Sequence, residues 1–75
     1  MKRYDYQVVE SFCEEFGVTT YGLSVCTIID EQTAPRISIK DISSNWAAVI
    51  RLAEQCQRLQ LNPIHLPDVI EDFLS

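Results

Sequence analysis

The chain has little glycine, since Gly17 and Gly22 are the only two among its 75 residues. A phosphate-binding loop needs several glycines, because they let backbone N–H groups come close to the anion. No serine stands in the G-x-S-x-G turn that exposes a hydrolase nucleophile. These absences count against a nucleotide-binding protein and against a hydrolase of that type.

Positive charge is also scarce. Six Lys and Arg residues stand against eleven Asp and Glu residues, which gives a net charge of -5. The basic residues are scattered along the sequence: Lys2, Arg3, Arg36, Lys40, Arg51 and Arg58. Affinity for nucleic acids and for anionic membranes comes largely from clustered basic side chains. We therefore expect no nucleic acid and no membrane among the partners.

Long apolar runs and paired cysteines are missing as well. The first residues lack the apolar segment of a signal peptide, and no stretch approaches the roughly 20 apolar residues of a membrane span. Cys13, Cys26 and Cys56 are odd in number and far apart, which is typical of reduced thiols in the cytosol. Together with His65 they lack the close ligand pairs of a zinc site. We expect a cytoplasmic protein without a metal or cofactor.

What the chain does have is enough apolar residues for a core. With 47% hydrophobic and 23% charged residues, it is expected to form one globular domain over residues 1–75. A chain this short has a small core, and small domains often gain stability by oligomerising. A homodimer is therefore among the expected states.

Alternation of apolar and polar residues predicts three strands, at about residues 3–13, 19–30 and 36–42, joined by turns at residues 14–17 and 31–35. In the second strand, one set of alternate residues forms a core face: Tyr21, Leu23, Val25, Thr27 and Ile29. The other set is small and nearly uncharged: Gly22, Ser24, Cys26 and Ile28. This second face is expected to be a mildly apolar exposed surface, or else to be approached closely by another backbone or subunit.

Two helices are expected to follow. The first begins at one of four capping residues and runs to about Leu59 or Gln60; the candidates are Asp41, Ser43, Ser44 and Asn45. Its apolar side is expected to cover the sheet and consists of Trp46, Val49, Ile50, Leu52, Ala53, Cys56 and Leu59. On its polar side, Glu54 and Arg58 are spaced for an ion pair.

The second helix is expected to begin at Pro67. One arc of it is apolar and consists of Val69, Ile70, Phe73 and Leu74. A helix of about eight residues is too short to be stable alone, so this arc either completes the core or binds a partner. The predicted fold class is α+β: a three-stranded antiparallel β-meander followed by two helices (β-β-β-α-α), packed on one sheet face.

The first strand is the best candidate for an interaction surface. In a meander the first and third strands are edges, and the third is short and protected by Pro35 and Lys40. The first strand carries Val8, Val9 and Phe12 with little protection. We therefore expect a non-catalytic protein-interaction or regulatory module that associates with itself or with a partner through this strand.

A pocket near His65 is the alternative. His65 is the one side chain whose ordinary pKa lies near neutrality, and it stands in a tight connection before a helix. With Tyr21 and Trp46 it would line the site of a small enzyme or ligand-binding protein. Otherwise His65 bonds a neighbouring backbone group or caps the helix. No recognisable set of catalytic groups accompanies it.

Residues 18–23 and 61–74 resemble a family of short, uncharacterised proteins from Firmicutes, especially clostridia, that is classed as a domain of unknown function. The segment from Pro63 to Leu74 is the most specific part of the likeness. The resemblance implies a bacterial cytosolic origin and brings no activity to any residue.

Overall fold

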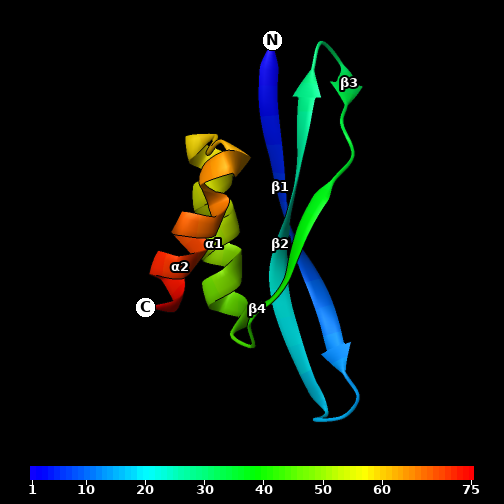
Figure 1. Ribbon diagram of the computed structural model, residues 1–75, viewed down its shortest axis with the longest axis vertical. Coiled ribbons are helices and arrows are strands. Elements are labelled where there is room, and N and C mark those ends of the chain that lie inside the picture. The colour runs from blue at the N-terminus through cyan, green and yellow to red at the C-terminus, as the bar shows by residue number, and fades with distance from the viewer.

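The computed structural model describes all residues, 1–75, and has an α+β architecture. The elements follow in the order β1 (Lys2–Cys13), β2 (Val18–Ile29), β3 (Gln32–Thr33), β4 (Ile37–Ser43), α1 (Trp46–Leu59), the 3₁₀ helix η1 (Pro63–His65) and α2 (Leu66–Leu74). Both helices lie on one face of the antiparallel sheet (Figure 1). The predicted fold class is confirmed, with the short strand β3 as an addition.

Strand β2 is the centre of the sheet. It pairs with β1 from Lys2 opposite Ile29 to Cys13 opposite Val18, and with β3 and β4 on its other side. Asp30 and Glu31 both have positive φ, 49° and 70°, as in a tight two-residue hairpin turn. The chain therefore folds straight back onto β2, and β3 forms inside the segment expected to be a longer turn.

A bulge in β4 brings its backbone against β2. The register shifts between Tyr21 and Leu23, and Asp41 has a φ of 58°. A methyl group on Gly22 would clash with the carbonyl oxygen of Ile39 and lie 2.9 Å from Cα of Lys40. Only glycine allows this contact, so the close backbone approach that was one of two expectations for this face is found here.

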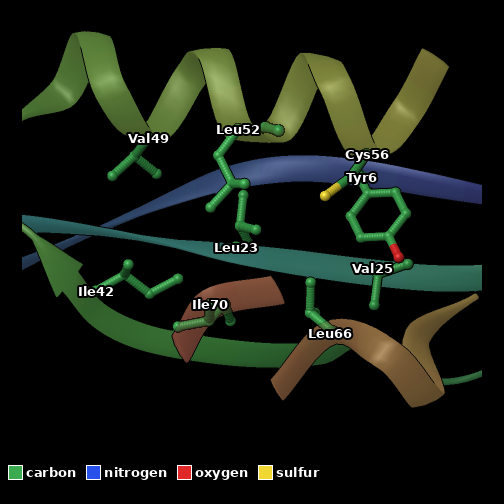
Figure 2. Close-up of a cluster of buried hydrophobic side chains, with 10 residues drawn as sticks. Tyr6, Leu23, Val25, Ile42, Val49, Leu52, Cys56, Leu66 and Ile70 are labelled. Carbon is green, nitrogen blue, oxygen red and sulfur yellow. The ribbon is translucent and has the colours of Figure 1, made fainter. Parts of the chain in front are cut away.

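The core lies between the sheet and the helices (Figure 2). Its members are Tyr6, Leu23, Val25, Ile42, Val49, Leu52, Ala53, Cys56, Leu66 and Ile70. Trp46 and Leu59, which were expected on the covering side of α1, are instead 53% and 63% exposed. They are the first and last residues of α1. They lie on the same side of the helix as the buried residues, but at its two ends.

The structure selects one of the four candidate caps of α1. The Asn45 side chain accepts a hydrogen bond of 3.1 Å from the N–H of Ala48. At the other end, Gln60 is left-handed with a φ of 50° and terminates the helix. The ion pairs of the protein are Met1 with Asp30 and Asp5 with Arg36, so the expected pair of Glu54 and Arg58 is not formed.

Helix α2 closes the core, as its apolar arc suggested. Leu66 and Ile70 are only 2% and 9% exposed, while Val69 and Phe73 pack half-buried beside them. Leu74, the last residue of α2, is 61% exposed and does not dock. The helix begins at Leu66, one residue earlier than expected, because η1 leads directly into it. Neither α1 nor α2 has the length and apolar composition required to cross a membrane.

Candidate interaction surface on the first strand

Alternate residues of β1 turn their backbone groups away from β2. Along an antiparallel strand, every second residue exchanges backbone hydrogen bonds with the partner strand, and the residues between point their N–H and C=O groups away from it. The N–H of Asp30 donates to the carbonyl of Met1, which places the odd-numbered residues in the bonded pairs. The outer edge of β1 therefore presents the N–H and C=O groups of Tyr4, Tyr6, Val8, Glu10 and Phe12.

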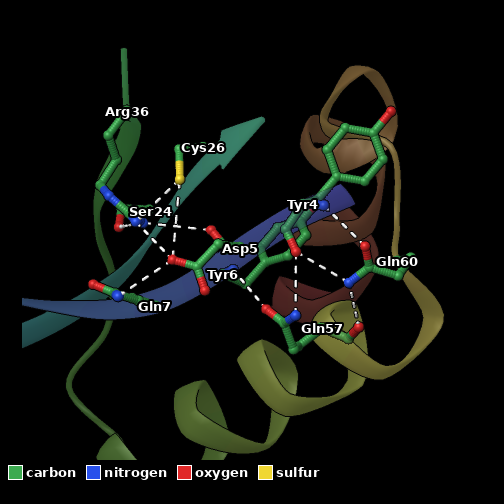
Figure 3. Close-up of polar contacts among 9 residues, drawn as sticks. All are labelled: Tyr4, Asp5, Tyr6, Gln7, Ser24, Cys26, Arg36, Gln57 and Gln60. Carbon is green, nitrogen blue, oxygen red and sulfur yellow. Dashed lines mark hydrogen bonds and ion pairs between the residues drawn. The ribbon is translucent and has the colours of Figure 1, made fainter. Parts of the chain in front are cut away.

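Two glutamine side chains from α1 and its C-cap close the first part of this edge (Figure 3). The N–H of Tyr4 donates to Oε1 of Gln60 at 2.9 Å, and the N–H of Tyr6 donates to Oε1 of Gln57 at 2.7 Å. In return, Nε2 of Gln57 and of Gln60 donate to the carbonyl of Tyr4 at 3.1 and 3.0 Å. Because a carboxamide carries both a donor and an acceptor, the two side chains stand in for a neighbouring strand.

The end of α1 aims these amides at the strand. Gln57 and Gln60 are three residues apart and so lie on the same side of the last turn. Nε2 of Gln60 also donates to the carbonyl of Gln57 at 2.8 Å, which fixes the side chain. Beside them the hydroxyl of Tyr6 donates to the carbonyl of Leu61 at 2.6 Å. The end of α1 is thus tied to β1 by several bonds.

Burial sets the protonation of two groups next to these bonds. The pKa of Tyr6 is raised to about 12, chiefly by burial and to a smaller extent by Cys56 and Tyr4. Burial also raises the pKa of the Cys56 thiol. Both groups are therefore protonated near neutral pH, and Tyr6 acts as a hydrogen-bond donor.

The second part of the edge has no such cover. The N–H groups of Val8, Glu10 and Phe12 point outward, and no side chain or loop accepts from them. Phe12 is on the same face as the helices but is 62% exposed, because the β1–β2 hairpin extends past them (Figure 1). We call residues 4–7 the closed half of β1 and residues 8–13 the open half.

A groove of about 630 Å³ runs between β1 and α1 where the two halves meet. Its apolar wall consists of Val8, Ile50 and Ala53, and its rim includes Glu54 and Arg58. Arg58 has no acidic partner within the chain. The groove is therefore an apolar hollow beside unpaired backbone groups, with one unpaired positive and one unpaired negative side chain at its rim.

The structure separates the three residues predicted to bind a partner. Val8 and Phe12 are on the helix side of β1 in the open half, where Val8 lines the groove and Phe12 lies farther along the strand. Val9 pairs with Gly22, so its half-buried side chain lies on the opposite face. Val8 and Phe12 share one face, with Glu10 between them, and Val9 does not belong to it.

The residues of the alternative pocket do not come together. Trp46 begins α1, and His65 follows its end, with a helix about 21 Å long between them. His65 is exposed, and its side chain makes neither of the two expected bonds, to a neighbouring backbone group or as a helix cap. Tyr21 is half-buried against the core. None of the three lines the groove or the other two principal hollows.

A polar cluster on the back of the sheet was not foreseen. Arg36 donates to the Ser24 hydroxyl at 2.9 Å, to the Asp5 carboxylate at 2.8 Å and to the Cys26 sulfur at 3.2 Å (Figure 3). Ser24 is fully buried and Cys26 is 4% exposed. The expectation of an exposed face is therefore wrong here, because a side chain of the same chain covers it.

Comparison with known proteins gives a family and no activity. A model of a family of unknown function, DUF6514, matches residues 1–75. No curated protein and no solved structure matches the chain. The match agrees with the resemblance to a domain of unknown function that residues 18–23 and 61–74 suggested. The chain belongs to this family of unknown function, DUF6514.

Proposed function

We propose that this protein is a non-catalytic interaction module whose open half of β1 receives an extended strand from a protein partner. One observation carries the proposal. The outer edge of β1 is closed by Gln57 and Gln60 up to Tyr6 and is free from Val8 to Phe12.

An unpaired strand edge is a ready template for strand addition. The added strand supplies backbone hydrogen bonds, and side-chain pockets next to the edge supply specificity. Here the groove beside Val8 offers such a pocket, and Phe12 offers exposed apolar area. The edge and the groove together provide both requirements on the same side of β1.

An enzyme or ligand-binding protein has weaker support. It rested on a pocket around His65, and the structure holds that residue a helix length away from Trp46.

A cytoplasmic location also belongs to the proposal, since all three cysteines are free thiols, which suits a reducing compartment.

Substitution of Glu10 by proline tests the proposal. The N–H of Glu10 points away from β2, so Glu10→Pro removes a donor from the open edge and leaves the β1–β2 bonds in place. The matched control is Ser38→Pro, which removes an outward donor from the opposite edge of the sheet, on β4. Thermal unfolding of both variants verifies that each remains folded.

The readout is crosslinking in the native cell, followed by mass spectrometry of the captured proteins. We expect the wild type and Ser38→Pro to capture the same partner, and Glu10→Pro to lose it. Equal capture by all three chains, or capture of no protein by any, would contradict the proposal.

A further inference from the structure

We infer that the strand received by the open half is β1 of a second copy of this chain, antiparallel, with Val8 opposite Phe12 of the second copy. Phe12 of each copy then enters the groove of the other. The inference rests on the proposed function and names its partner.

The length of the open half fits this register. When Val8 is opposite Phe12 of the second copy, Gln7 is opposite Cys13 of the second copy, where β1 ends. The second copy enters its hairpin turn opposite Tyr6, where Gln57 already occupies the edge. The register thus uses the whole open half and displaces none of the bonds that close the other half.

The groove fits the side chain that this register delivers. Residues directly opposite in a sheet share a face, so Phe12 of the second copy lies on the helix side, next to Val8. There it meets the apolar wall of Val8, Ile50 and Ala53. In a single copy Phe12 is 62% exposed because no helix covers it. The two-fold symmetry of such a dimer buries both phenyl rings in equivalent grooves.

A second copy also brings a carboxylate to one of the two charged residues on the groove rim. The rim carries Glu54 and Arg58, and neither has an ion-pair partner within the chain. Glu14, the first residue after β1, would be opposite Tyr6 of the other copy, near Gln57 and Arg58 at one end of the groove. At the two-fold axis Glu10 meets Glu10 of the second copy. Like charges directly opposite weaken a strand pair, so this position serves as a probe of the register.

Sedimentation equilibrium over a range of concentrations tests the dimer. We expect the wild type to dimerise, Phe12→Ala to weaken the dimer about tenfold or more, and Glu10→Gln to strengthen it about two- to fivefold. Phe16→Ala is the matched control, since Phe16 is 74% exposed in the turn beyond the paired segment. It should leave dimerisation unchanged.

A cysteine scan tests the register itself. Gln7→Cys would place a thiol opposite Cys13 of the second copy, in a pair whose Cα atoms are about 4.5 Å apart and within reach of a disulfide. With oxidised glutathione as oxidant, this variant should give a covalent dimer. Val9→Cys would face Ser11 of the second copy and should not. Gln7→Cys combined with Cys13→Ser should also remain monomeric on a non-reducing gel.

The outcomes separate the inference from the proposed function. A monomer at high micromolar concentration, or a dimer that ignores Phe12→Ala and is not crosslinked through Gln7→Cys, overturns the inference. Suppose that the inference fails, but the wild type captures a different protein in the cell and Glu10→Pro does not. The proposed function then stands without the inference. If Glu10→Pro captures the same proteins as the wild type, the proposed function fails as well.

Discussion

The two halves of β1 differ most in what covers their outer edge. Both pair with β2 in a continuous register, and both alternate between the helix side and the back of the sheet. In the closed half, Gln57 and Gln60 bond the N–H groups of Tyr4 and Tyr6 and the carbonyl of Tyr4. In the open half no side chain bonds an outward backbone group. Protection of a strand edge is therefore decided here by what packs beside the strand, and not by the strand's own sequence.

The comparison also shows how a small domain leaves one edge available. Edges are usually blunted by charged residues, by proline, by bulges or by brevity. Strand β4 follows that pattern, with its bulge at Asp41 and its short length. Strand β1 is long and unbulged, and the amides from α1 reach only as far as Tyr6.

The largest effect is expected at Gly22, which supports the open half because it pairs with Val9. Gly22→Ala should lower the free energy of unfolding by about 3 kcal/mol, since the added methyl group clashes with the backbone at Ile39 and Lys40. Gly17→Ala is the control, because its added methyl group meets open space. Its only cost is the backbone strain of an alanine at a φ of 61°. Urea unfolding measures both. An equal cost for the two variants would mean that the contact of β4 with β2 is loose.

A smaller effect is expected from opening the closed half. Gln57→Ala leaves the N–H of Tyr6 without its acceptor and should cost about 1–2 kcal/mol in urea unfolding. Gln55→Ala, an exposed residue of the same helix without a hydrogen bond, should cost less than about 0.5 kcal/mol. Indistinguishable costs would show that the amide does not hold the edge.

The closed half should also have a signature at high pH. Because the folded state raises the pKa of Tyr6 from 10.0 to about 12, it holds the phenol proton more tightly than the unfolded chain does. The stability that the neutral phenol contributes is complete below about pH 10 and is lost as the pH rises toward 12. Tyr6→Phe should therefore flatten the fall of unfolding free energy across that window. Parallel curves for the variant and the wild type would contradict this.

The smallest effect on stability is expected in the open half. In dilute solution Phe12→Ala should change the free energy of unfolding by less than about 0.5 kcal/mol, because the side chain is 62% exposed. Val8 is half-buried at the boundary between the two halves, so Val8→Ala should lower the free energy of unfolding by more than Phe12→Ala does. A large loss for Phe12→Ala in the monomer would place that ring in the core and remove it from the interaction surface.

The sequence predicted the elements well because they rest on local patterns. Alternation marked β1, β2 and β4, and the apolar arc of α2 identified Ile70 as a core residue. Strand β3 was missed because Asp30 and Glu31 adopt positive φ without glycine or asparagine, the residues that normally signal such a turn.

The site was less accessible from the sequence. Nothing local to Gln57 and Gln60 shows that their amides will meet Tyr4 and Tyr6, which are more than fifty residues earlier in the chain. Arg36 likewise reaches Asp5 across 31 positions. Such contacts depend on how elements pack, so the predicted meander order identified β1 as an edge and could not say which half of it is covered.

Hydrogen exchange of single amides compares the two halves most directly. In dilute solution we expect the N–H groups of Tyr4 and Tyr6 to exchange slowly and those of Val8, Glu10 and Phe12 to exchange close to the rate of an unprotected chain. As the concentration rises, the latter three should become protected while the first two stay unchanged. Equal exchange rates for all five amides in dilute solution would contradict the division of β1 into a closed and an open half.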